Sequence, residues 1–228
     1  MANLPPVSFA KRSFVYRQFD GASFSAMGQG AIAENLPNNT HSSAHNSAQQ
    51  SALLDLTVMA RTGFRGANAA AHLEQAGLPV PAKPNQLAVS ANGELVLRLS
   101  HKEFWILGSL KDDGAAVTQL TTDSLVRESV YPLYCQHSHG YFVMTGQHLA
   151  DTMAKICGVD LRIEAFPVGA IAQTSLARVN AVIAHHEING IPAFIILSDI
   201  SSSEYLWSAL LDAMDEFGGQ AIGRAALS

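Results

Sequence analysis

The stretch that decides the fold reads Ala181-Val-Ile-Ala-His-His-Glu-Ile-Asn-Gly-Ile-Pro-Ala-Phe-Ile-Ile-Leu197. Two β-prone runs in it flank the pair Asn189-Gly190. This pair predicts a two-residue hairpin turn, because a type I′ turn needs positive φ at both central residues. A third β-prone run, Ile171 to Val179, precedes them. The sequence therefore predicts an antiparallel sheet in the second half of the chain.

A final helix is expected directly after this sheet. Ser201-Ser-Ser-Glu204 has the spacing of a capping box, and Gly218-Gly219 is a typical helix stop. Between them, apolar residues recur with helical period and form one stripe, made of Tyr205, Leu206, Ala209, Leu210, Ala213, Met214 and Phe217. We expect this stripe to pack on the sheet.

The two halves of the chain resemble each other. Residues 61–77 read as a glycine turn, a helix rich in Ala and Leu, and a glycine stop. Residues 144–158 repeat this plan, with Thr145-Gly146 standing where Thr62-Gly63 stood. Strand signals follow each helix; in the first half they are the runs Leu95–Leu99 and Glu103–Leu107, which predict a hairpin.

Helices packed on one face of mostly antiparallel strands define an α+β fold. We expect duplicated half-units over residues 53–130 and 131–228, joined in one folded unit. Residues 1–52 are expected to form an extended arm and a polar linker, since 12 of the 14 residues from Asn38 to Ser51 are Asn, Ser, Thr, His or Gln. The arm's apolar side chains pack either on their own domain or on another chain; they are Phe9, Phe14, Val15, Tyr16, Phe19, Phe24, Met27 and Ile32.

Composition excludes several classes of protein. Fourteen Lys and Arg against nineteen Asp and Glu give a net charge of −5, which does not favour nucleic acid binding. No window approaches the roughly 18 consecutive apolar residues of a membrane span. Two early prolines interrupt the segment where a secretory signal would lie, and two cysteines are too few for a disulfide framework. We expect a cytoplasmic protein that binds neither nucleic acid nor membrane.

A metal site is suggested by Cys135, His137 and His139. On a strand, these side chains would alternate to one face and offer ligands for zinc or copper. However, residues two apart on a strand stand about 6.5 Å from each other, and a fourth ligand is missing. Of His185 and His186, at most one could join the site, because neighbours on a strand point to opposite faces. We therefore assign no metal ligand.

No other motif assigns a catalytic or cofactor-binding residue. Gly63-x-x-Gly66 before the first helix could offer N–H groups to a phosphate, but helix entry explains it equally well, and no dinucleotide or phosphate-loop motif is complete. Cys157 is expected to be a small core residue. The carboxylates near the expected elements lie at their edges, where capping or solvation is the common role; they are Asp55, Asp160, Glu164, Glu187 and Asp199.

Several segments spread over residues 53–217 resemble the gamma subunit of heterotetrameric sarcosine oxidase. In the first half they are 55–66, 76–85 and 97–107, and in the second Gln136-His-Ser-His-Gly140, 166–174 and Ser203-Glu-Tyr-Leu-Trp207. That subunit is similar in fold to the folate-binding domain of the glycine-cleavage aminomethyltransferases. The resemblance thus implies an aminomethyltransferase folate-binding-domain-like fold.

The resemblance also implies a non-catalytic role. The family's strand aspartate, which assists one-carbon transfer, would fall between Leu176 and Glu187, where this chain has none. The implied protein is a non-catalytic subunit that packs against the alpha subunit, with beta and delta subunits completing the complex. FAD, FMN, NAD and tetrahydrofolate would be bound by those partner chains. The complex oxidatively demethylates sarcosine to glycine and passes the carbon to tetrahydrofolate.

Two alternatives remain at this stage. One is a free-standing folate-dependent aminomethyltransferase or demethylase-like protein. The other is a metal-binding module that uses Cys135, His137 and His139.

Overall fold

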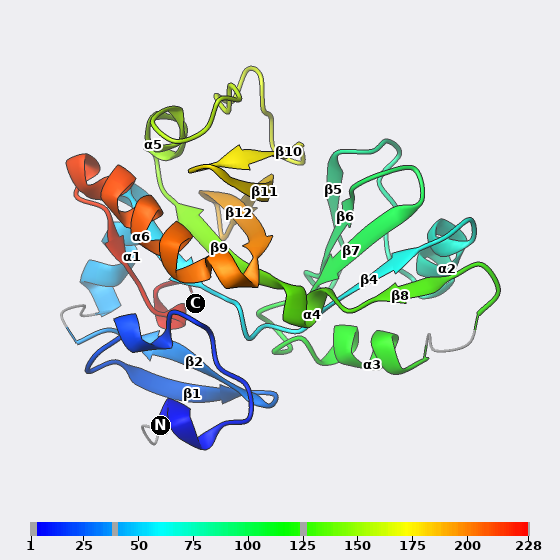
Figure 1. The fold of residues 1–228 in the computed structure, drawn as a ribbon, viewed down its shortest axis with the longest axis horizontal. Coiled ribbons are helices and arrows are strands. Elements are labelled where there is room, and N and C mark those ends of the chain that lie inside the picture. Colours follow the sequence, from blue (N-terminus) through cyan, green and yellow to red (C-terminus); the bar gives the residue numbers. More distant parts are fainter. Residues whose placement is uncertain (1–3, 38–40, 124–126, 228) are drawn as a thin grey trace. The chain divides into compact units, whose positions relative to one another are not determined.

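The computed structural model describes residues 4–37, 41–123 and 127–227, and these form two compact units (Figure 1). Unit 1 comprises residues 1–58, 139–168 and 172–228, and unit 2 comprises residues 59–138 and 169–171. This division differs from the expected half-units, because the N-terminal segment packs with unit 1 and the chain crosses between the units after Val58, Ser138, Val168 and Ile171.

The sheet of unit 1 has six strands in the order β10-β11-β12-β9-β3-β13. Neighbours from β11 to β3 are antiparallel, whereas the short β13 runs parallel to β3. Asn189 and Gly190 both have positive φ, 52° and 79°, so the predicted hairpin turn is confirmed. The strands are β3 (Ala52–Asp55), β9 (His139–Thr145), β10 (Ile171–Leu176), β11 (Val179–Ile188), β12 (Ile191–Asp199) and β13 (Gln220–Ala221).

Helix α6 (Ser203–Met214) is the predicted final helix, and its core positions are Leu206, Trp207, Leu210, Ala213 and Met214. The capping-box prediction is wrong. Ser202 is the N-cap and makes no side-chain cap bond, and Asp199 instead caps the preceding turn η3 (Ile200–Ser202). After η4 (Asp215–Phe217), Gly218 ends the helical segment with a φ of 65°. Helix α5 (Leu149–Ala154) packs beside α6.

The N-terminal segment is ordered structure on unit 1. It contains the turns η1 (Pro6–Ser8) and η2 (Tyr16–Gln18) and the hairpin β1 (Ser23–Met27) and β2 (Gly30–Asn35). Residues 41–50 of the expected linker form helix α1 (His41–Gln50), because Ala44 and Ala48, one turn apart, are buried and tie the helix to the unit. Phe24 and Ile32 of the arm are also buried, so the arm packs on its own chain.

Unit 2 has a five-stranded sheet in the order β5-β6-β7-β4-β8, antiparallel throughout. The predicted hairpin of the first half is confirmed as β6 and β7. Helices α2 (Ala69–Gln75) and α3 (Ala115–Asp123) cover one face, where Leu73 and Val117 pack with Phe64 and Phe104. The strands are β4 (Arg61–Arg65), β5 (Gln86–Val89), β6 (Leu95–Arg98), β7 (Glu103–Leu107) and β8 (Tyr131–Leu133).

The repeat between the halves has a different register from the expected one. In unit 2, β4 ends at Arg65 and Gly66 leads into α2; in unit 1, β9 ends at Thr145 and Gly146 leads into α5. Both glycines have positive φ, 144° and 112°. Gly66, rather than Gly63, is therefore the counterpart of Gly146, and Gly63 lies inside β4.

None of the helices formed by the described residues is long and apolar enough to cross a bilayer.

Candidate functional site

The principal candidate site is a cavity of about 310 Å³ in unit 1. Its polar lining comes from strands β9 to β11: His139, Gln173, Thr174 and Asn180. Ala181, Val182 and Leu197 provide the apolar part. The described lining residues include no carboxylate, so the cavity can form hydrogen bonds with a ligand, and the His139 imidazole is the one side chain of this lining that could transfer a proton.

Asp199 is the acidic residue next to this site along the sheet, because it pairs with His139 across β12 and β9. Its Oδ1 accepts hydrogen bonds from the Ser201 N–H at 2.9 Å and the Ser201 hydroxyl at 2.6 Å. These bonds hold the pKa of Asp199 below its usual value. The carboxylate is therefore ionised and serves as a turn cap.

The other edge carboxylates also have local roles or lie in solvent. Asp55 Oδ1 accepts from the Thr57 N–H at 2.9 Å. Asp160 binds the Arg162 guanidinium, and its hydrogen bonds to Arg162 lower the pKa of Asp160 to about 2. Glu164 and Glu187 are exposed.

The suggested metal ligands do not share a strand. Cys135 and His137 lie in the short helix α4 (Cys135–Ser138), and His139 begins β9, so the strand geometry expected for them is wrong. Burial raises the pKa of the Cys135 thiol to about 11, which keeps it protonated. Among the described residues, no group of three or more His, Cys, Asp and Glu side chains is arranged to hold a metal ion.

His185 and His186 occupy successive positions of β11 and face opposite ways, as predicted. His185 is buried, its Nδ1 lies 2.6 Å from the Phe166 carbonyl, and its ring stacks on Phe166. Burial lowers the pKa of the half-buried His186. Cys157 is buried, as predicted for a small core residue.

The Gly63-x-x-Gly66 motif does not form a phosphate loop. Gly63 is a strand residue. At Gly66, a Cβ would lie 2.0 Å from the Ser129 carbonyl oxygen, so close backbone approach explains this glycine.

Arg61 is a buried cation that the sequence analysis did not single out. Its guanidinium donates to three backbone carbonyls: Cys135 at 3.1 Å, Gln136 at 3.0 Å and Met59 at 3.4 Å. Its own N–H donates to Gln136 Oε1 at 2.8 Å. These hydrogen bonds hold α4 against the start of β4. The only signal in the sequence is an arginine that opens a β-prone run.

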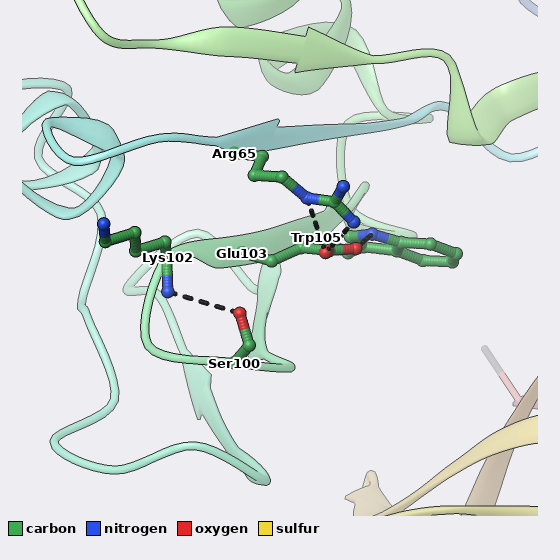
Figure 2. Close-up of polar contacts among 5 residues, drawn as sticks. All are labelled: Arg65, Ser100, Lys102, Glu103 and Trp105. Carbon is green, nitrogen blue, oxygen red and sulfur yellow. Dashed lines mark hydrogen bonds and ion pairs between the residues drawn. The ribbon is translucent and has the colours of Figure 1, made fainter.

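A second polar group joins β4 and β7 (Figure 2). Arg65 Nε donates to Glu103 Oε2 at 2.9 Å, and Trp105 Nε1 donates to Glu103 Oε1 at 3.1 Å. Beside them, the Lys102 N–H donates to the Ser100 hydroxyl. Both oxygens of Glu103 are engaged, so the group stabilises the sheet and does not provide a free base.

Comparison with known protein families shows the family to which this chain belongs. A family model described as "Sarcosine oxidase, gamma subunit family" matches residues 63–216. The chain belongs to this family. A comparison with curated protein sequences finds no match.

Two solved structures of other proteins have folds similar to that of this gamma subunit family member. It resembles a chain of heterotetrameric sarcosine oxidase from Corynebacterium sp. U-96 in complex with pyrrole 2-carboxylate, with a TM-score of 0.62 and 23% identity over 76% of this chain and 91% of that one. It also resembles glycine cleavage system aminomethyltransferase T from Bartonella henselae, with a TM-score of 0.73 and 20% identity over 95% of this chain and 60% of that one. The predicted aminomethyltransferase-like α+β fold is confirmed.

In this family member, the segment expected to carry a catalytic aspartate is the end of β10 and most of β11. Residues 176–187 contain a single carboxylate, Glu187, which is exposed near the far end of β11. Asn180 lies where the strand borders the cavity. An asparagine amide can bind a ligand there but cannot accept a proton at neutral pH.

Proposed function

We propose that the chain acts as a non-catalytic gamma subunit, which supports assembly of a sarcosine oxidase complex by docking on the large alpha subunit. The observation that carries this proposal is the absence of a carboxylate among the described residues that line the cavity of unit 1. The fold is that of an aminomethyltransferase, while the described acidic groups near the cavity serve as caps. A scaffold whose cavity lacks a carboxylate in its described lining is suited to a structural role.

In this proposal, the chemistry belongs to the other chains. The beta and delta subunits complete the assembly, and the partner chains hold FAD, FMN, NAD and tetrahydrofolate. The whole complex demethylates sarcosine to glycine and transfers the released carbon to tetrahydrofolate. The protein acts in the cytoplasm.

The docking surface is proposed to include Tyr131 and Tyr134. Their exposed fractions are 63% and 78%, which are high for large aromatic side chains. They lie in and beside β8, an edge strand of the unit 2 sheet. Edge strands and exposed aromatics are typical of protein interfaces. The apolar side chains of the N-terminal arm that are buried on unit 1, such as Phe24 and Ile32, are not available for this contact.

Co-expression with the alpha subunit tests the proposal. We expect a stable complex on size-exclusion chromatography, a higher yield of active assembly, and a loss of affinity of at least tenfold in the double variant Tyr131→Ser, Tyr134→Ser. Val89→Ser is the matched control, since Val89 is 48% exposed on β5, the opposite edge of the same sheet. Failure of the unmodified chain to associate or to raise the yield would overturn the assembly role.

A free-standing folate-dependent enzyme is the second candidate, favoured by the polar cavity itself. Isothermal titration calorimetry with tetrahydrofolate separates the two. Micromolar binding that is weakened by Asn180→Ala, together with turnover of an N-methyl donor, would favour the enzyme. Absence of turnover with any such donor would favour the subunit role.

A further inference from the structure

Unit 2 contains a buried carboxylate that the assembly role does not use. Glu94, at the end of the turn between β5 and β6, is only 3% exposed. One of its oxygens, Oε1, has no hydrogen-bond partner among the described residues. A carboxylate oxygen shielded from water without a donor is costly, by several kcal/mol in general. Such a group in a folded protein calls for a specific explanation.

The hydrogen bonds of Ser90 engage only the other oxygen of the Glu94 side chain, Oε2. The Ser90 hydroxyl oxygen accepts from the Gly93 N–H at 3.1 Å and from the Glu94 N–H at 3.0 Å. Its single proton is thus left to donate to Glu94 Oε2, with which it is in contact. Oε1 is left without a donor among the described residues.

Glu94 lines a pocket of about 140 Å³. The pocket lies between the β5–β6 turn, the residues that follow α2, and the first turns of α3. Apart from Glu94, Ser90 and Asn92, the lining is apolar, with Leu78, Val117 and Leu120 as its largest side chains. Pockets for drug-sized ligands have volumes of about 300–1,000 Å³, so this one suits a ligand of only a few heavy atoms.

We propose that this pocket binds a small protonated amine. Its ammonium group donates to Glu94 Oε1, and its short alkyl chain lies against Leu78, Val117 and Leu120. An ammonium ion supplies both the positive charge and the donor that Oε1 lacks. A neutral alcohol of the same size would supply a weaker hydrogen bond and no charge. The proposal does not depend on the assembly role, because every residue in it belongs to unit 2.

Propylammonium chloride and its neutral isostere 1-propanol are the probes, added to the full chain at constant ionic strength and followed by NMR. We expect saturable shifts of the amide resonances of Ser90, Asn92 and Leu120 with propylammonium, and an affinity at least about tenfold weaker for 1-propanol. Equal affinities for the two probes, or no saturable shift with propylammonium, would overturn the proposal. The comparison needs no variant.

Two variants sharpen the test. Glu94→Gln keeps the shape of the side chain and should abolish the preference for the ammonium probe; a preference that persists in folded Glu94→Gln protein would show that another group binds the amine. Lys111 is the control, since its Cε lies 3.7 Å from the position that a Cβ on Gly93 would take. Lys111→Ala should bind propylammonium at least as tightly as the unmodified chain. Binding that appears only in Lys111→Ala would mean that Lys111 occupies the carboxylate in solution, and would overturn the proposal.

Discussion

Arg224 Nη2 lies 2.6 Å from Glu34 Oε1, and this ion pair ties the last turn of the described chain, η5 (Arg224–Leu227), to strand β2. Glu34 is buried and also accepts from the Ser25 hydroxyl. The pair adds a polar contact to the apolar packing that holds the N-terminal segment on unit 1. It joins two segments that are far apart in the chain through a largely buried charge contact, which water screens less than an exposed one.

Removing one partner of this pair should destabilise the protein. Arg224→Met leaves the Glu34 carboxylate buried without its cation, and we expect a loss of about 2–4 kcal/mol in the free energy of unfolding, measured with urea. The double variant Arg224→Met, Glu34→Gln should recover part of the loss, because no buried charge then remains. A single-variant loss below about 0.5 kcal/mol would show that the pair is solvated.

The Cys135 thiol should react slowly with disulfide reagents. With a pKa of about 11, only roughly one thousandth of it is thiolate at pH 8, against about a tenth for an unperturbed thiol with a pKa near 9. Arg61→Met removes the donors that hold α4 and should expose the thiol, raising the rate of reaction with Ellman's reagent by at least about tenfold. Cys157→Ala protein serves as the background, so that Cys135 alone is followed. Equal rates in both proteins would contradict the anchoring role of Arg61.

The same thiol should make stability depend on pH. The pKa of this thiol is raised in the folded state, so the protonated thiol contributes fully to the free energy of unfolding below its unfolded pKa near 9. This contribution is lost as the pH rises towards 11, because deprotonation is then favoured in the unfolded chain. The free energy of unfolding of Cys135→Ala should therefore decline less between pH 8.5 and 10 than that of the unmodified chain. Identical slopes in chemical denaturation over this range would show that Cys135 titrates normally.

Gly146 should tolerate no side chain. A Cβ there would lie 2.3 Å from the Gln50 carbonyl oxygen, and its φ is 112°. We expect Gly146→Ala to lower the free energy of unfolding by about 2–4 kcal/mol in urea denaturation. Gly158→Ala is the matched control, since no atom lies within 4 Å of a Cβ at that site, and its effect should stay within about 1 kcal/mol. Similar effects of the two substitutions would mean that the backbone yields at Gly146.

Local signals predicted much of the fold. The Asn189-Gly190 turn, the β6–β7 hairpin and the stripe of α6 all follow from short-range sequence patterns whose physical basis is backbone conformation or burial on one face. Helix α1 was missed because its composition is polar; what stabilises it is the burial of Ala44 and Ala48, which only the folded unit provides. The capping-box prediction failed for a local reason: Asp199 accepts a hydrogen bond from the Ser201 N–H and caps the turn η3 that precedes α6.

The cavity and the buried charges could not be predicted from local sequence patterns. Asn92-Gly93 carries the same hairpin signal as Asn189-Gly190 and places Glu94 directly after a turn, but nothing local shows that Glu94 is buried. The ion pair of Glu34 and Arg224 joins residues 190 positions apart along the chain. Arg61 likewise meets Cys135 and Gln136 only after β4 and α4 come together.

The sequence alone determined the α+β class, the positions of strands β6, β7, β10, β11 and β12, the absence of an aspartate between residues 176 and 187, and the resemblance to the family, because each depends on residue types and their local order. Tertiary structure alone decided which charges are buried, which glycines face a neighbouring carbonyl, and where the N-terminal segment packs. These depend on contacts between residues far apart in the chain, and the desolvation that gives such contacts their energy exists only in the folded protein.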